Sequence, residues 1–321
     1  MSLGGGAARR RWFGSAAIAF LALTVTLVGA PAMAVTLPPA GTSTAIAQAV
    51  AKSTSIQRLT STVARKVFNA PNDNPAVDYP KTKNGCLTLT ACVFGDKVSS
   101  KVIVVLGDSH AQMWIPTLNR IGVTKQMRVI ILFMARCPAA TLDVWLTAYN
   151  KAYTACSSTR SGWITAIDSL HPVTVLLTDH TNGVTSAASM GTQQFTAPQW
   201  QAGMQTTITD LQPSNAKIAI IGDTNTFNLS PPQCLAAYPH KVQTCSVPNP
   251  NPLRPSLASA EQAAAKAAAV LYVNPTKWLC TSTTCAPVVG SFIVYYDTFH
   301  LTCSYAAYLS GVMQTALKRV L

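Results

Sequence analysis

The sequence predicts an α/β protein, with a three-layer α/β/α sandwich built around a mainly parallel sheet. From about Lys101 onward, short aliphatic runs alternate with segments of helical length. The runs are continuously apolar, which is typical of strands covered on both faces. Apolar residues make up 49% of the 321 residues and charged residues 11%, so the chain can bury a sizeable core.

Each element follows from a local pattern. The strand candidates are rich in Val, Ile and Leu, and they read VIVVL, RVIILF, VTVLLT, KIAIIG and VLYV, over residues 102–106, 128–133, 173–178, 217–222 and 270–273. Helical candidates lie between them, at residues 110–121, 158–170, 198–211 and 256–269. Parallel strands joined in this way take right-handed crossovers, and reactive groups collect at the strands' carboxyl ends.

The first 34 residues resemble a secretory signal. Arg9, Arg10 and Arg11 precede an uncharged apolar run that ends in Ala-Met-Ala at Ala34. This order of basic, apolar and small residues predicts a signal peptide cleaved after Ala34, and an uncleaved membrane anchor is the alternative. Both interpretations place the rest of the chain outside the cytoplasm, either secreted or at the outer face of the cell membrane.

Residues 35–100 differ from the part that follows. Apolar residues between Ile46 and Val67 recur at broadly helical spacing, and a segment rich in Pro and Asn comes next. We therefore expect a helical extension and linker over 35–100 and a catalytic domain over 101–321.

The charge balance is strongly basic. The formal net charge is +13, and without the three N-terminal arginines 21 Lys and Arg stand against 11 Asp and Glu. The basic residues are scattered and no aromatic platform lies among them, so nucleic acid is not an expected partner. An anionic cell envelope suits this balance better.

The nine cysteines of an exported chain indicate disulfides. Proximity in the sequence suggests four pairs and leaves Cys303 over: Cys86–Cys92, Cys137–Cys156, Cys234–Cys245 and Cys280–Cys285. No Cys-x-x-Cys spacing supports a zinc site, and we expect no cofactor.

The first strand runs directly into Gly107-Asp108-Ser109-His110. Glycine permits a sharp turn there, and the serine hydroxyl can project from the top of the sheet. A serine is a weak nucleophile without a base nearby. Asp108 and Ser109 are also common at helix starts, so this motif alone could be an ordinary cap.

A base appears near the end of the sequence, in YYDTFHLT. Asp297 and His300 stand three residues apart, after a strand-like run and before a terminal amphipathic segment. This arrangement lets His300 reach Ser109 while Asp297 orients the imidazole. His110 is expected to pack beside the site, and Asp223, which no serine follows, is expected to cap a turn.

Together these motifs resemble the first and last sequence blocks of the SGNH hydrolases, and most closely the SGNH domains fused to bacterial membrane acyltransferases. Cys137-Pro138, Cys234-Leu235 and the segment YVNPTKWLC add to the resemblance, which covers residues 101–321. It implies a flavodoxin-like SGNH fold in which Ser109 is the nucleophile and Asp297 and His300 complete the triad.

The resemblance also implies an oxyanion hole. The backbone N–H of Ser109 would contribute to it, and Asn182 in HTNG matches the asparagine of the third block. Ala135 and Arg136 stand where the second block has a small donor residue, so that part departs from the family pattern.

The function expected from these residues is that of an extracytoplasmic serine esterase or O-acyltransferase. The resemblance implies acetyl or other short acyl esters of cell-envelope glycans as substrates, and a separate membrane acyltransferase as a possible partner. One alternative is a glycan-binding module of the same fold without activity. The other is a metal-dependent hydrolase, whose candidate ligands are Asp108, His110, His180, Asp297 and His300.

Overall fold

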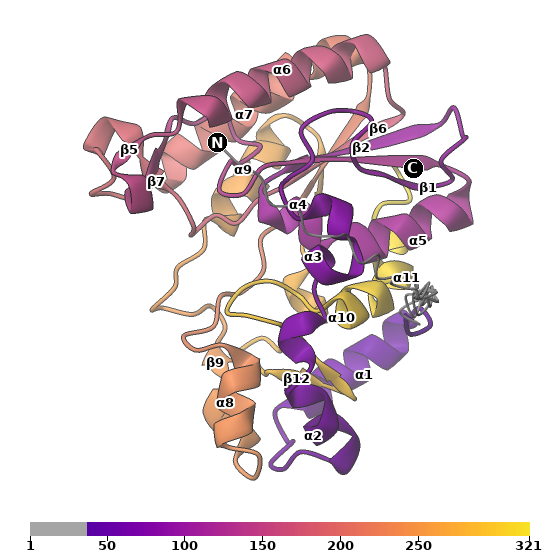
Figure 1. Cartoon of the computed structure of the whole chain (residues 1–321), viewed down its shortest axis with the longest axis vertical. Coiled ribbons are helices and arrows are strands. Elements are labelled where there is room, and N and C mark those ends of the chain that lie inside the picture. Colours follow the sequence, from indigo (N-terminus) through magenta and orange to yellow (C-terminus); the bar gives the residue numbers. More distant parts are fainter. Residues whose placement is uncertain (1–36) are drawn as a thin grey trace, which may run out of the picture. The chain divides into compact units, whose positions relative to one another are not determined.

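The computed structural model describes residues 37–321, which lie in one compact unit spanning Thr36–Leu321 (Figure 1). The signal peptide or anchor predicted over residues 1–34 falls outside the described residues. Within residues 37–321, no helix is both long and apolar enough to cross a membrane.

A six-stranded sheet forms the centre of the fold, in the order β1-β3-β2-β6-β8-β10. The strands are β1 (Val93–Gly95), β2 (Val102–Gly107), β3 (Arg128–Phe133), β6 (Thr174–Thr178), β8 (Lys217–Ile221) and β10 (Leu271–Val273). Only β1 pairs in the antiparallel direction. The five parallel strands thus follow the 2-1-3-4-5 order of flavodoxin-like folds, which confirms the predicted class.

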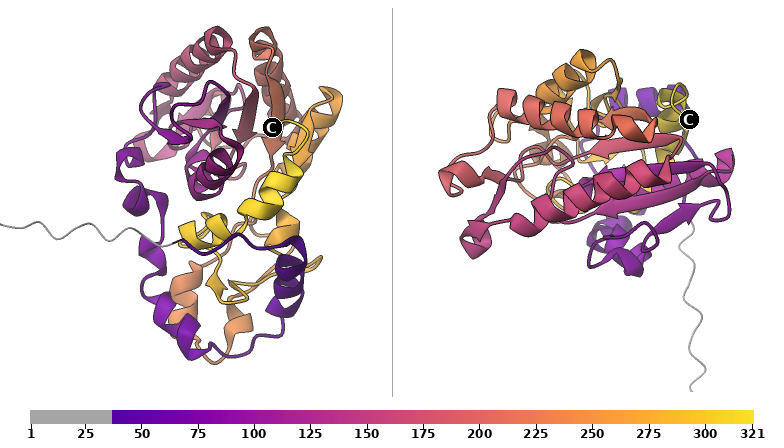
Figure 2. Two further views of the ribbon diagram at one scale, coloured as in Figure 1. Left: turned by 90° about the vertical axis from the view of Figure 1, so that its right-hand side faces the viewer. Right: turned by 90° about the horizontal axis from the view of Figure 1, so that it is seen from above.

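Helices cover both faces of this sheet, and the two layers can be followed in Figures 1 and 2. One face carries α4 (Ser109–Met113), α5 (Ile115–Lys125), α10 (Cys303–Tyr308) and α11 (Ser310–Ala316). The other carries α6 (Thr154–Leu170), α7 (Ala197–Asp210) and α9 (Ala258–Ala267). Alternate residues of each strand face opposite layers. Ile103 and Val105 of β2 lie in the first core, for example, and Val104 and Leu106 in the second.

The helix expected over 110–121 is divided into α4 and α5 at Trp114. The reason is Pro116, which has no backbone N–H and whose ring would clash with the carbonyl of Gln112 in a continuous helix. The other three predicted helices, and all five predicted strands, are present with small differences at their ends.

The segment expected as an extension contains α1 (Ser43–Ser53), α2 (Ser61–Val67) and α3 (Pro75–Asp78). Ile46 and Val50 of α1 enter the core shared with the sheet, while Val63 and Val67 of α2 join a smaller cluster. That cluster also includes α8 (Pro231–Ala237) and the hairpin of β12 (Val288–Val289) and β13 (Phe292–Ile293). The domain boundary placed at residue 101 stays a prediction.

Short strands in the loops complete the fold. They are β4 (Val144–Leu146), β5 (Lys151–Ala152) and β7 (Thr185–Ser186) in one small sheet, and β9 (Val247–Pro248) and β11 (Thr284–Cys285) in another. All four predicted disulfides are formed, and Cys303 is free and buried. Burial raises the pKa of the Cys303 thiol, so this cysteine stays protonated and unreactive.

Candidate active site

Ser109 lies where β2 ends and α4 begins. The strand order reverses between β2 and β6, which leaves a crevice at the carboxyl ends of these two strands. Ligands of open α/β sheets bind in this crevice. Gly107 is required for the close approach of β2 to β6, because a Cβ on it would overlap the carbonyl oxygen of Thr178. The turn therefore lifts Ser109 out of the sheet and leaves it half-buried.

Asp108 shapes this turn with both of its carboxylate oxygens. Oδ1 accepts a hydrogen bond from the backbone N–H of His110 at 2.8 Å, and Oδ2 accepts one from the backbone N–H of His180 at 2.9 Å. The side chain thus caps α4 and also ties it to the loop after β6. Because both oxygens are occupied by buried amides, Asp108 is a positioning residue for Ser109.

The structure brings Ser109, His300 and Asp297 together, although the serine and the aspartate lie far apart in the sequence. The Nε2 atom of His300 lies 2.8 Å from Ser109 Oγ, and its Nδ1 atom lies 2.7 Å from Asp297 Oδ2. The other oxygen of Asp297 accepts hydrogen bonds from the backbone N–H groups of Phe299 and His300. Burial would raise the pKa of Asp297, but the hydrogen bond and charge of His300 lower it overall, so the carboxylate stays ionised.

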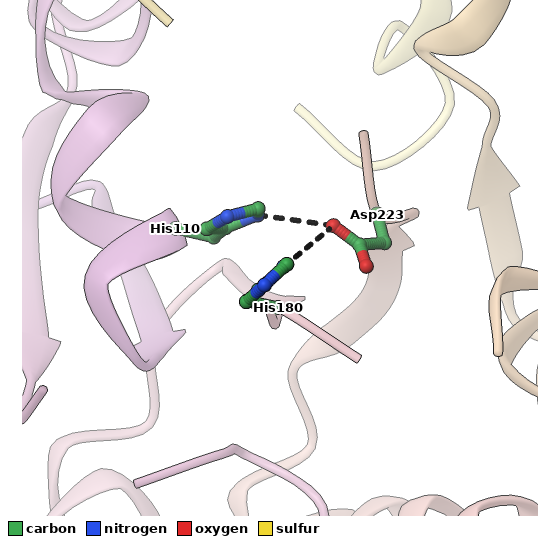
Figure 3. A group of neighbouring side chains, drawn as sticks. All are labelled: His110, His180 and Asp223. Carbon is green, nitrogen blue, oxygen red and sulfur yellow. Dashed lines mark ion pairs between the residues drawn. The ribbon is translucent and has the colours of Figure 1, made fainter. Parts of the chain in front are cut away.

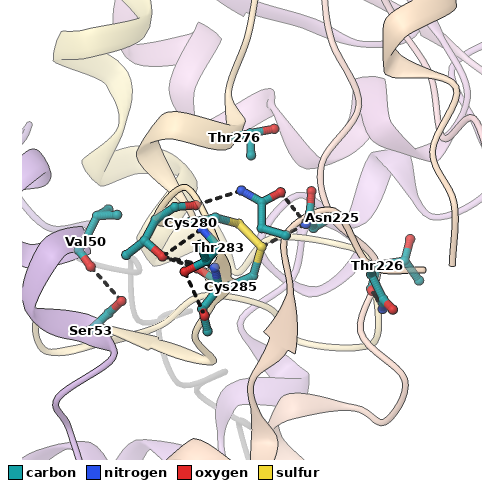
Figure 4. Close-up of a disulfide and its surroundings, with 12 residues drawn as sticks. Val50, Ser53, Asn225, Thr226, Thr276, Cys280, Thr283 and Cys285 are labelled. Carbon is teal, nitrogen blue, oxygen red and sulfur yellow. Dashed lines mark hydrogen bonds between the residues drawn. A yellow bond between two sulfur atoms is a disulfide. The ribbon is translucent and has the colours of Figure 1, made fainter. Parts of the chain in front are cut away.

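Neighbouring loops hold the segment that carries His300. The backbone N–H of Phe227 donates to the carbonyl of Thr298 at 2.6 Å, and Thr224 Oγ1 donates to the carbonyl of Phe299 at 3.3 Å. Asn225, which lies between Thr224 and Phe227 in the sequence, donates a hydrogen bond to Cys285 Sγ of the Cys280–Cys285 disulfide (Figure 4). This staple therefore supports the loop after β8, which in turn positions the His300 segment.

A cavity of about 370 Å³ opens in front of Ser109 and His300. Its wall includes Arg136, Asn182 and Arg254 from three different loops. A larger cavity of about 560 Å³ lies between α2 and strand β13, and no histidine of residues 37–321 lines it. The smaller cavity is therefore the better candidate for an active site.

Asn182 lines this cavity, but its side chain is already engaged. Its Nδ2 atom donates to the carbonyl of Pro255 at 2.6 Å, and its Oδ1 atom accepts from Gln194. A side-chain amide carries two N–H donors. One hydrogen bond to Pro255 therefore fixes the orientation of Asn182 and leaves its second N–H for another acceptor.

Ala135 and Arg136 form a turn directly after β3. Arg136 has a φ of 62°, in the left-handed region where glycine is favoured, and the turn is closed by a hydrogen bond from Cys137 N–H to the Met134 carbonyl. Within residues 37–321, the backbone N–H groups of Ser109, Ala135 and Arg136 have no protein acceptor. These amides are available to a ligand.

Behind the serine lies a buried group formed by His110, His180 and Asp223 (Figure 3). Asp223 Oδ1 is 3.2 Å from Nδ1 of His110 and 3.7 Å from Nδ1 of His180. Burial would raise the pKa of Asp223, but hydrogen bonding and the charges of the two histidines lower it strongly. Burial lowers the pKa of His110. Burial also opposes protonation of His180, but the interaction with Asp223 outweighs it and raises the pKa of His180.

Asp223 therefore does more than cap a turn. Its Oδ1 accepts from the adjacent backbone N–H of Thr224, as a capping residue would, while its Oδ2 accepts from the amide and the hydroxyl of Thr181. The candidate metal ligands named from the sequence lie in two separate groups. His110 and His180 join Asp223, with ligand atoms within 4.8 Å of one another, whereas Asp297 and His300 bind each other beside Ser109.

Glu261, the single glutamate of the sequence, lies buried next to Asp223. Its Oε2 atom accepts from the backbone N–H of Asp223 at 3.1 Å, and its Oε1 atom has no partner among the described residues. Burial first, and then repulsion by Asp223 and Asp179, raise the pKa of Glu261 well above its ordinary value. Glu261 is thus a carboxylic acid that resists ionisation.

We expect Glu261→Gln to stabilise the protein at neutral pH. Because the folded-state pKa is raised, the wild type has its full stability below the ordinary pKa of 4.5 and loses part of it as the pH rises toward the folded value. Glutamine keeps the acceptor and carries no charge, so the advantage of the variant should be small below pH 4.5 and grow with pH. Urea unfolding across this range measures the difference. The exposed Asp210→Asn is the control, and a difference that does not grow with pH would contradict the prediction.

Sequence reasoning missed Glu261, Arg254 and the wider role of Asp223. Glu261 lies in an alanine-rich helix, where a single acid looks like part of the solvent-exposed face. Arg254 stands in a proline-rich loop without periodicity. A signal for Asp223 was present, since it follows a strand just as Asp108 does, at the edge where reactive groups collect.

Comparison with protein families gives one match. The model of the SGNH domain that occurs fused to AT3 domains matches residues 77–315, and so includes Ser109, Asp297 and His300. The resemblance identified from the motifs is confirmed. Among curated proteins, none is similar enough to this chain to be matched.

Several solved structures resemble this chain at low sequence identity. The periplasmic domain of the lipopolysaccharide acetyltransferase of Salmonella ser. Paratyphi A is 17% identical with a TM-score of 0.55, and the match covers 81% of this chain and 97% of that one. An acylhydrolase described as putative, from Bacteroides fragilis, is 12% identical with a TM-score of 0.43 and coverages of 77% and 98%. The acetyl xylan esterase AlAXEase is 16% identical, also at 0.43, with coverages of 67% and 99%.

Proposed function

This chain belongs to the family of SGNH domains found fused to AT3 domains, and is an ester hydrolase or acyltransferase; from that premise we propose that it transfers or hydrolyses short acyl esters through Ser109, His300 and Asp297. The observation that carries the proposal is the continuous line of contacts from Asp297 through His300 to Ser109, with 2.7 Å and 2.8 Å between the atoms. A nucleophile, a base and an orienting acid at these distances are the geometry that acyl transfer needs.

The ionised Asp297 accepts a hydrogen bond from Nδ1–H of His300. This fixes the tautomer in which Nε2 carries no proton and can accept the proton of Ser109. The serine oxygen then attacks the ester carbonyl, and its proton moves to Nε2. When the tetrahedral intermediate collapses, the leaving alcohol takes that proton and the acyl group stays on Ser109. Water or an acceptor hydroxyl next attacks the acyl-serine, again with His300 as base, and restores the free serine.

Backbone and side-chain donors would stabilise the oxyanion of each tetrahedral intermediate. We assign this role to the N–H of Ser109 and to the second amide N–H of Asn182, with the free amides at Ala135 and Arg136 as the second-block contribution. Donors fixed before the reaction are more effective than donors that must reorganise. The hydrogen bond from Asn182 to Pro255 supplies such fixation.

Family membership and cysteine chemistry support a substrate class and a location. Four disulfides support an oxidising compartment outside the cytoplasm. Fusion of related domains to AT3 domains supports an acyl group, such as acetyl, on an envelope glycan. If the reaction is a transfer, a membrane acyltransferase acting as a separate partner would supply the acyl group.

A fluorophosphonate probe tests the proposal, because it labels only a serine that is activated by a base. We expect rapid labelling of Ser109 in the wild type, together with turnover of 4-nitrophenyl acetate. His300→Ala should slow both by about 100-fold or more. His240→Ala, at an exposed histidine outside the cavity, is the matched control. Equal labelling of wild type and His300→Ala would overturn the assignment, and a folded wild type without label or turnover would favour the glycan-binding alternative.

A further inference from the structure

Two arginines lie on the wall of the cavity that contains Ser109. Arg136 comes from the loop after β3, and Arg254 comes from the loop between β9 and α9. Both are exposed, and within the described residues neither guanidinium makes a hydrogen bond or an ion pair. Ten N–H donors are therefore available around this opening, because each guanidinium carries about five.

The carboxylates near the cavity already have other hydrogen-bond or ion-pair partners. Asp108 is buried and accepts from two backbone amides, and Asp297 is bound to His300. Asp223 is buried against His110 and His180. The three ion pairs of residues 37–321 all involve histidine, so no carboxylate of the described chain neutralises the two arginines.

The loop of Arg136 is held in place. Arg136 adopts a φ of 62°, a left-handed conformation that favours glycine and is strained for a residue with a side chain. The next residue, Cys137, closes the turn by a hydrogen bond to Met134 and forms a disulfide with Cys156 in α6. An arginine on a strained, stapled turn at the mouth of a cavity is a candidate for function rather than a freely moving surface side chain.

The loop of Arg254 is tied to the same cavity from the other direction. Pro255, its neighbour, accepts the hydrogen bond from Asn182, and Leu257 N–H donates to Thr181 Oγ1 at 2.8 Å. On the preceding side, Asn251 donates to the carbonyl of Thr226 at 2.7 Å. These contacts join the Arg254 loop to the loops after β6 and β8, which carry other parts of the cavity wall.

We propose that Arg136 and Arg254 form an anion-binding subsite, and that the preferred ester substrate carries a carboxylate or phosphate on the part attached to the ester oxygen. This inference rests on the proposed function, because it specifies the substrate of the same site. Guanidinium groups bind both anions through paired N–H donors, and they keep their charge at any physiological pH. The basic balance of the chain, with 21 Lys and Arg against 11 Asp and Glu when the three N-terminal arginines are left out, adds a general attraction for such substrates.

The test compares acetate release from three acetyl esters: those of a neutral hexose, a hexuronic acid and a hexose phosphate. For the wild type, kcat/KM should be higher for at least one anionic ester than for the neutral one, and the larger of the two ratios identifies carboxylate or phosphate as the recognised group. In Arg136→Gln and Arg254→Gln we expect this ratio to fall about tenfold or more, mainly through KM. Arg254→Lys should restore part of it, and Arg58→Gln, at an exposed arginine outside the cavity, should leave it unchanged.

Two outcomes separate this inference from the proposed function. If the wild type hydrolyses the esters without preferring an anionic one, or if both glutamine variants keep the wild-type ratio, the subsite is wrong and the proposed function stands. If the wild type hydrolyses none of the esters and the probe does not label Ser109, the proposed function is wrong. In that case, calorimetric binding of galacturonate and glucose 6-phosphate against glucose still decides the subsite. Binding of an anionic sugar that weakens in Arg254→Gln supports it, and equal binding of all three sugars overturns it.

Discussion

Ser109→Ala is expected to abolish ester turnover, lowering kcat by about 1000-fold or more while the protein stays folded. Without Oγ no acyl-serine can form, and the donors around the oxyanion can support only slow direct attack by water. Folding should persist because the turn is held by the carboxylate of Asp108 and the backbone amides of His110 and His180. Acetate release measures the loss of turnover, and circular dichroism and urea unfolding show whether the variant stays folded.

Ser158→Ala is the matched control, since this exposed serine of α6 only donates to the carbonyl of Ala155 in its own helix. It should keep wild-type turnover. The result that contradicts the serine mechanism is full activity in Ser109→Ala combined with loss of activity in the presence of a chelator. That pair of observations would move the reaction to the His110, His180 and Asp223 group.

The fold could be predicted almost entirely from local patterns. The run at 128–133 coincides with β3, and the other strands differ only by a residue at their ends, because continuous aliphatic runs have one natural place in a sheet covered on both faces. The helix at 110–121 was predicted wrongly as one piece. Pro116 was visible in the sequence, but the effect of a proline depends on whether the helix continues on both sides of it.

Residues of the candidate site could be predicted when they belong to sequence motifs. Residues that reach the site only through contacts between distant segments could not. Ser109, Asp297 and His300 were found because each follows a recognisable strand or precedes a helix. The buried acid Glu261 has no such context, and only packing of α9 against the end of β8 brings it to Asp223. The same holds for Arg254, whose position in the cavity is set by contacts to the loops of Thr181 and Thr226.

Asp297→Asn is expected to lower kcat by about 100-fold to 10,000-fold with little change in overall structure. Asparagine can still accept hydrogen bonds from the backbone amides of Phe299 and His300 through its oxygen, as Asp297 Oδ1 does. Its amide would then face His300 Nδ1 as a donor and favour the tautomer that carries its proton on Nε2. That tautomer cannot accept the proton of Ser109. Asp210→Asn, at an exposed acid of α7, is the control and should retain wild-type kcat.

The pH dependence of stability provides a second measurement on the same variant. The folded-state pKa of Asp297 is lowered by His300 below the ordinary value of 3.8, so its charge contributes stability above pH 3.8 and that contribution is lost as the pH falls further. Asp297→Asn should therefore be less stable than the wild type at neutral pH, and the two should converge as the pH falls below 3.8. Because the carboxylate remains ionised throughout the mildly acidic range, any loss of wild-type activity between pH 7 and about 5 has to come from a group other than Asp297. If Asp297→Asn keeps wild-type kcat, the carboxylate serves the stability of the loop alone, and His300 takes its tautomer from elsewhere.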